Sequence, residues 1–213
     1  MLHDFFKILK EVVYKEYRQN LSKNEDNTLY FSLLENSADA TCREAKFQKD
    51  KKQDVLILKF DKTITDDNSV RQNEPLFFLS QGIARSKADY LLFYLTKIKG
   101  EESLVVTICN MKSGKTANNL DQLKASESLA HFILGVAIRV YNSSIQNKTG
   151  KNYLEIQGEN QLNLKITKVL FANDNSPVFK NTTNITEMNK RKSEFKSCKC
   201  GSDVYDINLE WRK

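Results

Sequence analysis

The spacing of hydrophobic residues changes along the chain, and the change separates predicted helices from predicted strands. In residues 2–20, apolar side chains recur at three- and four-residue steps, which predicts an amphipathic helix packed by one face. Residues 21–28 are polar and predict a loop. Residues 29–47 begin with the apolar run LYFSLL and are ambiguous, with a short second helix as one interpretation.

The clearest pattern is that of a β-hairpin. Residues 88–97 and 103–111 are rich in β-branched and aromatic side chains, and the short turn between them contains Gly100. Two strands joined by so short a turn pair antiparallel. Upstream, the apolar run 54–60 predicts another strand, and the polar residues 61–74 predict a loop.

A long helix is predicted after the hairpin. Asn118 or Asn119 can cap it, and its apolar stripe continues to about Tyr141. Residues 152–157 and 162–172 predict strands, residues 173–203 a polar, basic loop, and a last strand falls within 203–211. The predicted fold is α/β, with a central mixed β-sheet flanked by helices. We expect one domain over residues 1–213, with its core motif region at about 54–140.

Composition says more about the cellular location of the protein than about its function. The chain carries 33 Lys and Arg against 27 Asp and Glu, a net charge of +6, which suits a polyanion or simply a solvated basic surface. No signal-peptide pattern is visible, and the apolar runs are too short for a membrane-spanning helix. Four irregularly spaced cysteines argue against a disulfide framework and for a reducing, cytoplasmic location.

Candidate chemistry gathers at one end of the hairpin. A turn centred near Gly100 sets Asp89 opposite Lys112 and Leu91 opposite Asn110, for residue numbers that sum to about 201. Because side chains alternate along strands, Asp89, Asn110 and Lys112 would share one face. A carboxylate and an amide oxygen suit a hard cation such as Mg²⁺, and an ammonium can orient water or stabilise charge on a phosphate.

These residues lie in a longer pattern: Lys87-Ala-Asp89, then Asn110-Met-Lys112-Ser-Gly, then Asn118-Asn-Leu-Asp-Gln122-Leu-Lys124. The pattern resembles that of the PD-(D/E)XK nuclease superfamily, which has an Asp at the start of one strand, an acid-x-Lys triplet on the adjoining strand, and a following helix that often bears Gln. The resemblance implies a restriction-endonuclease-like core and metal-dependent hydrolysis of DNA, with a defence or restriction role.

The same resemblance assigns roles to individual residues. Asp89 and Asn110 would bind Mg²⁺ or Mn²⁺, and Lys112 would act on the water or the phosphate. Gln122, Lys124 and Lys115 would contact nucleic acid, DNA before RNA. Asn110 departs from the family pattern, because an amide stands where Glu or Asp is expected. A further acid from Glu11, Glu16 or Asp61 could compensate.

Two other functions remain open. A degenerate family member would bind nucleic acid or a protein partner without cutting, and the missing acid at position 110 favours it. An antitoxin- or immunity-type partner protein, or a homodimer, is compatible with the composition. The sequence Ser113-Gly-Lys-Thr lacks the upstream glycine of a phosphate-binding loop, since Cys109 stands there.

Overall fold

The computed structural model describes the chain in segments. These are residues 1–13, 15–19, 22–23, 29–34, 42–49, 53–60, 63–66, 69–72, 88–112, 119–146, 154–155, 162–172, 196–200 and 204–207. No helix in these segments is long and apolar enough to cross a membrane.

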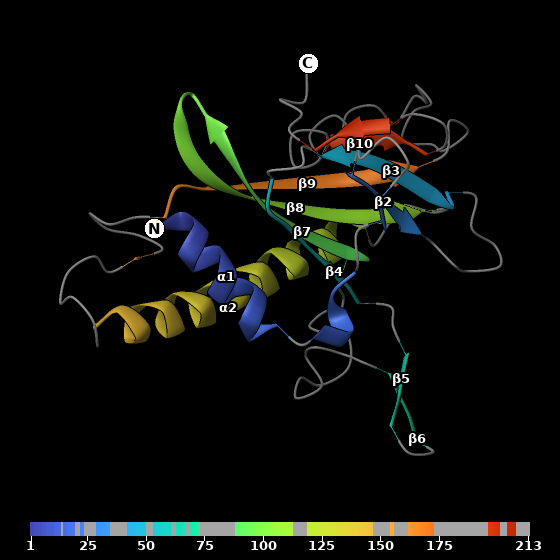
Figure 1. The fold of residues 1–213 in the computed structure, drawn as a ribbon. Helices are drawn as coiled ribbons and strands as arrows, with labels where there is room; N and C mark the ends of the chain where they lie inside the picture. Colours follow the sequence, from blue (N-terminus) through green and yellow to red (C-terminus); the bar gives the residue numbers. More distant parts are fainter. Residues whose placement is uncertain are drawn as a thin grey trace.

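A five-stranded mixed sheet, here the central sheet, organises the fold (Figure 1). Its order is β10-β9-β8-β7-β4, and the strands are β4 (Val55–Lys59), β7 (Tyr90–Ile98), β8 (Glu101–Lys112), β9 (Leu164–Ala172) and β10 (Lys196–Lys199). The strands β4, β7 and β8 pair antiparallel, whereas β9 is parallel to both β8 and β10. The predicted α/β class and mixed sheet are confirmed.

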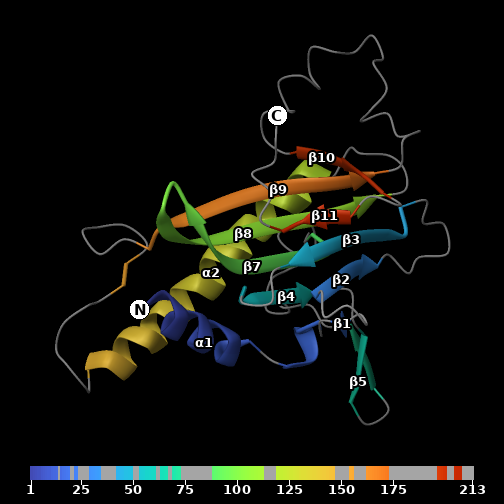
Figure 2. The same ribbon diagram turned by 45° about the horizontal axis from the view of Figure 1, so that its top comes forward.

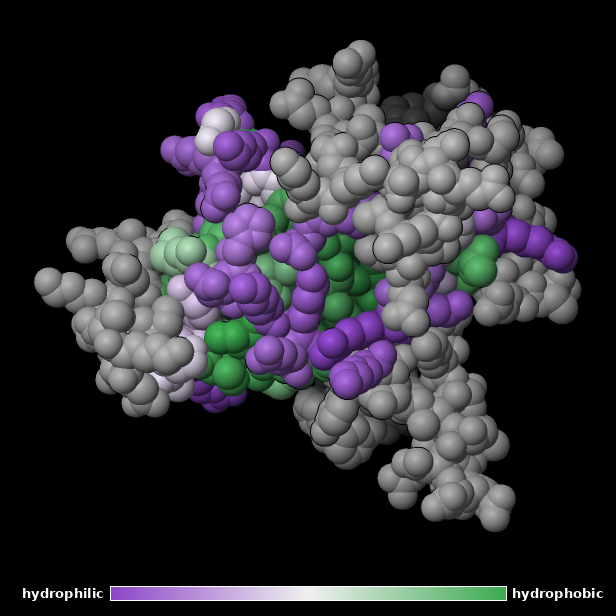
Figure 3. All heavy atoms as spheres, viewed as in Figure 1, coloured by the Kyte–Doolittle hydropathy of each residue, from purple (hydrophilic) through white to green (hydrophobic). Residues whose placement is uncertain are grey.

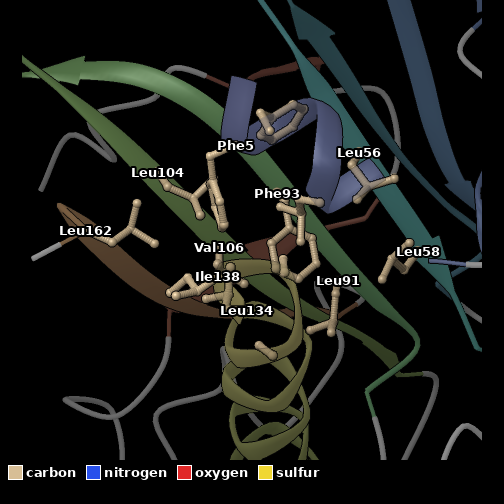
Figure 4. Packing of buried hydrophobic residues seen from close by; sticks show 14 of the residues in the cluster. Phe5, Leu56, Leu58, Leu91, Phe93, Leu104, Val106, Leu134, Ile138 and Leu162 are labelled. Carbon is tan, nitrogen blue, oxygen red and sulfur yellow. The ribbon is translucent and has the colours of Figure 1, made fainter. Parts of the chain in front are cut away.

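Two helices, α1 (Leu2–Val12) and α2 (Asn119–Gln146), cover one face of the central sheet (Figures 1 and 2). Their apolar side chains meet the odd-numbered residues of β7 and the even-numbered residues of β8 in one buried cluster. Figure 4 shows Phe5 of α1 and Leu134 of α2 packed over Phe93 and Val106 of the sheet. Burial of this stripe is what holds both helices in place.

A second sheet covers the other face, and we call it the small sheet (Figure 2). Its order is β1-β2-β3-β11, with β1 (Ser22–Lys23), β2 (Leu29–Leu34), β3 (Glu44–Lys49) and β11 (Val204–Asp206). Phe47 of β3 stacks on Phe31 at 4.9 Å between ring centroids and meets Phe171 of the central sheet edge-on at 5.7 Å. The central sheet is therefore buried on both faces.

Smaller elements complete the described chain. The 3-10 turn η1 (Lys15–Tyr17) follows α1, and β5 (Thr63–Asp66) pairs with β6 (Ser69–Gln72) in a hairpin that projects from the body (Figure 2). Polar side chains cover much of the described surface in the view of Figure 3, with apolar side chains visible between them.

Several predicted elements need correction. The first helix ends at Val12 rather than near residue 20. In the ambiguous segment 29–47, residues 29–34 form strand β2 and residues 44–47 start β3, and residues 35–41 lie outside the described residues. The segment predicted as a loop at 61–74 contains β5 and β6. Lys196–Lys199, within the predicted basic loop, form β10, and residues 173–195 of that loop lie outside the described residues.

Other predictions are confirmed or only partly described. The strands predicted at 54–60 and 162–172 are β4 and β9, and the long helix starts at Asn119 but continues to Gln146. In the predicted strand 152–157, the described residues Leu154 and Glu155 are not part of a named strand. The last strand is confined to Val204–Asp206 in the described chain.

Candidate functional site

Asp89 lies immediately before β7, on the helix-covered face of the central sheet. It is half-buried, and its Oδ2 atom accepts a hydrogen bond of 2.6 Å from the backbone N–H of Met111 in β8. At a strand end, a carboxylate that accepts a hydrogen bond from a backbone N–H takes the place of a backbone carbonyl of the neighbouring strand. One oxygen of Asp89 is thus committed to holding the two strands together.

Asn110 is the centre of the site. Its side chain is fully buried, and both of its polar atoms are bonded. Oδ1 accepts a hydrogen bond from the N–H of Asp89 at 3.1 Å, and Nδ2 donates one to Oε1 of Gln122 at 2.8 Å. Asn110 therefore links the start of β7 to the first turn of α2.

Ser126, one turn after Gln122 on α2, makes a second link to the same strand. Its Oγ accepts a hydrogen bond of 2.6 Å from the N–H of Ala88, and both residues are fully buried. A buried hydroxyl and a buried backbone N–H each need a partner, and here they satisfy each other. We call Asp89, Asn110, Gln122 and Ser126 the motif network.

The hairpin register differs from the predicted one. Ile98 pairs with Glu101 across a two-residue turn, and Tyr90 pairs with Cys109, so the next residues along the ladder are Asp89 and Asn110. The expectation that Asp89 lies opposite Lys112 is therefore wrong by two residues. A shift of two keeps every side chain on its predicted face, because strand side chains alternate with a period of two. The observed register places Asp89 directly opposite Asn110 on that face.

The remaining predicted residues separate into three groups. Gln122 joins the network, whereas Lys124 is exposed on α2. Glu11 is exposed on α1, and no described contact joins it to Asp89. The backbone of Lys112 ends β8 and pairs with Ala172, but its side chain, like that of Glu16, lies outside the described set. Lys115 and Asp61 lie wholly outside the described residues, backbone and side chain alike.

The donor set does not fit the metal that the resemblance implies. Across the described segments, no three His, Cys, Asp or Glu side chains come close enough to hold an ion together. Within the motif network, Asp89 supplies the single carboxylate, and the amide oxygen of Asn110 is buried and bonded to a backbone N–H. Mg²⁺ prefers carboxylate oxygens that are free to meet it with several waters. Among the described residues, the motif network therefore does not form a Mg²⁺ site.

On the opposite face of β8, the residue beside Asn110 is Cys109. Burial raises the pKa of its thiol well above the usual range, and the nearby Cys198 and Asp89 raise it further. The thiol consequently stays neutral at physiological pH, which makes it a packing residue rather than a nucleophile.

Sequence reasoning missed Ser126. The available signal was its place among the buried apolar positions of the helix, between Leu123 and Ala130. A small polar side chain on a buried helical face requires a partner, but the sequence does not say which backbone group supplies it.

Comparisons with family models, with curated proteins and with solved structures found no match to this chain.

Proposed function

We propose that this chain is a relative of the PD-(D/E)XK nucleases that binds nucleic acid, DNA before RNA, without hydrolysing it. The observation that carries the proposal is the bonding of Asn110. Where the family pattern has an acid, this chain has a neutral amide whose two polar atoms bond Asp89 and Gln122. The proposed family rests on the sequence resemblance. The amide of Asn110 favours a family member that has lost catalysis.

The physical reason is the cost of freeing Asn110. A rotation of the buried Asn110 side chain toward a metal would break its bonds to Asp89 and Gln122, and each buried polar group left unpaired costs about 1–3 kcal/mol. It would bring no negative charge in return. The network instead acts as a brace that fixes α2 against the start of β7.

Nucleic acid is favoured as the partner by the basic balance of the chain, +6 overall. Lysines and arginines displace counterions from a phosphate backbone, so such binding weakens steeply with salt. A protein partner of the antitoxin or immunity kind is the alternative if binding to nucleic acid is absent.

A metal-dependent nuclease is the second candidate. It is favoured by the convergence of Asp89, Asn110 and Gln122, but its metal would need acids beyond this network, from residues outside the described segments. In that case Lys112 would act on the water or the phosphate, and Asp61 is the closest acid in sequence after β4.

The deciding experiment combines cleavage and binding. Wild type and Asp89→Ala are incubated with plasmid, single-stranded DNA and RNA in Mg²⁺ or Mn²⁺, and affinity for labelled oligonucleotides is measured across a salt series. We expect no cleavage and a steep salt slope. Cleavage by wild type that Asp89→Ala abolishes would establish the nuclease instead. Absence of both cleavage and binding at low salt would leave the protein-partner alternative.

Restoring the acid tests degeneration directly. Asn110→Glu and Asn110→Asp return a carboxylate to the position, and gain of Mn²⁺-dependent cleavage from an inactive parent supports a lost nuclease. Asn163→Asp is the matched control, because it adds the same charge at an exposed residue beside the opposite end of β8. Cleavage gained by this control as well would trace the effect to a contaminant or to bulk charge.

A cytoplasmic location is also part of the proposal. The cysteine spacing argues against a disulfide framework, and the structure has one disulfide in the described chain, between Cys42 and Cys200. Stable disulfides are uncommon in reducing compartments.

A further inference from the structure

All four cysteines gather in the core between the two sheets. Cys42, Cys109 and Cys198 belong to that buried cluster, and Cys200 packs against it. Cys42 and Cys200 are bonded, with their Cα atoms 5.3 Å apart, although 158 residues separate them in sequence. Cys109 and Cys198 are free and buried.

The disulfide joins two residues that flank strands of different sheets. Cys42 comes two residues before β3 of the small sheet, and Cys200 directly follows β10 of the central sheet. The N–H of Cys200 donates a hydrogen bond of 3.0 Å to the carbonyl of Ala172, which pairs with Lys112 at the end of β8. The bond therefore joins the two sheets at the end where the motif network lies.

The C-terminal strands of the described chain are short and lie at the edges of their sheets. β10 has four residues and β11 has three, and each pairs with one neighbouring strand. Tyr205 of β11 also packs against Phe47 and Phe171. Short edge strands contribute few ladder hydrogen bonds, so a covalent link beside them adds to their stability.

We propose that the Cys42–Cys200 disulfide is a redox-controlled clasp between the small sheet and the central sheet. In the oxidised protein it holds β10 and β11 in place, and in the reduced protein these strands loosen. Cys200 is half-buried whereas Cys42 is fully buried, which makes the Cys200 sulfur the point of attack.

The chemistry needs a dithiol reductant. One thiolate of the dithiol attacks the sulfur of Cys200, the bond to Cys42 breaks, and Cys42 leaves as a thiolate that takes up a proton. The second thiol of the dithiol then displaces Cys200 from the mixed disulfide. Two electrons and two protons pass to the protein, and the dithiol becomes a disulfide.

Peptide mapping tests whether the clasp forms. Protein equilibrated in a glutathione redox buffer is unfolded without reductant, alkylated and digested with trypsin. Cleavage after Lys199 separates Cys198 from Cys200, so the peptide 24–43 should be found linked to 200–212 while Cys109 and Cys198 are alkylated. Four alkylated cysteines in the most oxidising buffer, or a different linkage, would overturn the proposal.

Thermal unfolding tests what the clasp does. Because the link closes a very long loop, a dithiol should lower the melting temperature of wild type by about 10 °C. Cys200→Ser should already melt at the lower temperature and not respond to the dithiol, whereas Cys198→Ala, which keeps the bond, should respond like wild type. A reductant effect below about 2 °C in wild type, or an equal effect in Cys200→Ser, would overturn the clasp.

Hydrogen exchange locates the effect. On reduction, we expect the largest acceleration of exchange in β10, β11 and β3, and a smaller one in α1 and β7, which follow the loss of global stability. Uniform acceleration over the whole chain, or none in β10 and β11, would contradict a local clasp.

Discussion

The backbone N–H of Asp89 donates a hydrogen bond to Oδ1 of Asn110, at 3.1 Å, and the carboxylate of Asp89 accepts one from the N–H of Met111, at 2.6 Å. Each residue therefore completes the hydrogen bonding of the other's strand at the point where β7 begins. Two residues that would serve as metal ligands by resemblance are here structural partners, and this has measurable consequences for stability.

Replacing Asn110 by Ala should cost about 2–3 kcal/mol of unfolding free energy, because it leaves the N–H of Asp89 without a partner in a buried site. Urea unfolding measures the loss. Asn163→Ala, at an exposed position, should stay within about 0.5 kcal/mol of wild type. In a double-mutant cycle with Gln122→Ala, we expect a coupling of about 1 kcal/mol, and strictly additive effects would disprove the Asn110–Gln122 bond.

Ser126→Ala should cost about 1–3 kcal/mol, since the N–H of Ala88 would lose its acceptor in the core. The matched control is Ser143→Ala on the same helix, where an exposed hydroxyl bonds the carbonyl of Arg139 one turn before. That control should be neutral or slightly stabilising, because Ala favours helices. Equal losses in the two variants would mean that helix propensity, not the bond to β7, sets the effect.

The elements that sequence predicted well are those with local signals. The hairpin strands and the long helix have strong periodicity and a short connection, so their pairing follows from the chain itself. The small sheet has weaker signals. In β3, polar residues alternate with Ala45 and Phe47, which is a strand pattern, but the run is short, and its neighbour β11 comes from the other end of the chain.

For the candidate site, the sequence predicted that Asp89 and Asn110 lie on one face of the hairpin, but not which groups they contact. Alternation of side chains along β7 and β8 was enough to predict that common face. The register depended on the turn, and Lys99-Gly100 is not the Asn-Gly pair that marks a two-residue turn. The bonds to Gln122 and Ser126 depend on how α2 docks, which is a tertiary property, as is the pairing of Cys42 with Cys200.

The turn itself yields a prediction. Lys99 has φ of 52° and Gly100 has φ of 89°, both in the left-handed region that Asn and Gly adopt most easily. Lys99→Asn should therefore stabilise the protein by about 0.5 kcal/mol. Gly100→Ala should destabilise it by about 1 kcal/mol through conformation alone, as no atom lies within 4 Å of the added methyl position. Lys97→Asn, in the adjoining strand, should not stabilise; if it does, the turn is not the cause.

Asp54 gives the protein a pH dependence. Partial burial by itself raises the pKa of Asp54, but the hydrogen bond and charge of Lys10, aided by His3, outweigh it and hold the pKa below its ordinary value of 3.8. A carboxyl whose pKa is lower in the folded state stabilises the fold above the unfolded pKa, and this contribution is lost as pH falls through the folded pKa. Asp54→Asn should thus lower stability at neutral pH and make little difference at the acid limit.

The magnitude is small, because the Asp54 side chain is 41% exposed and water screens its pair with Lys10, at 2.9 Å. We expect a loss below about 1 kcal/mol at neutral pH, measured by urea unfolding across the pH range. Lys10→Met should remove part of the same contribution, and the double variant should lose less than the sum of the two, because both act on one ion pair. A loss from Asp54→Asn that persisted undiminished into strong acid would show that hydrogen bonding of the neutral group, not its charge, links α1 to the residue before β4.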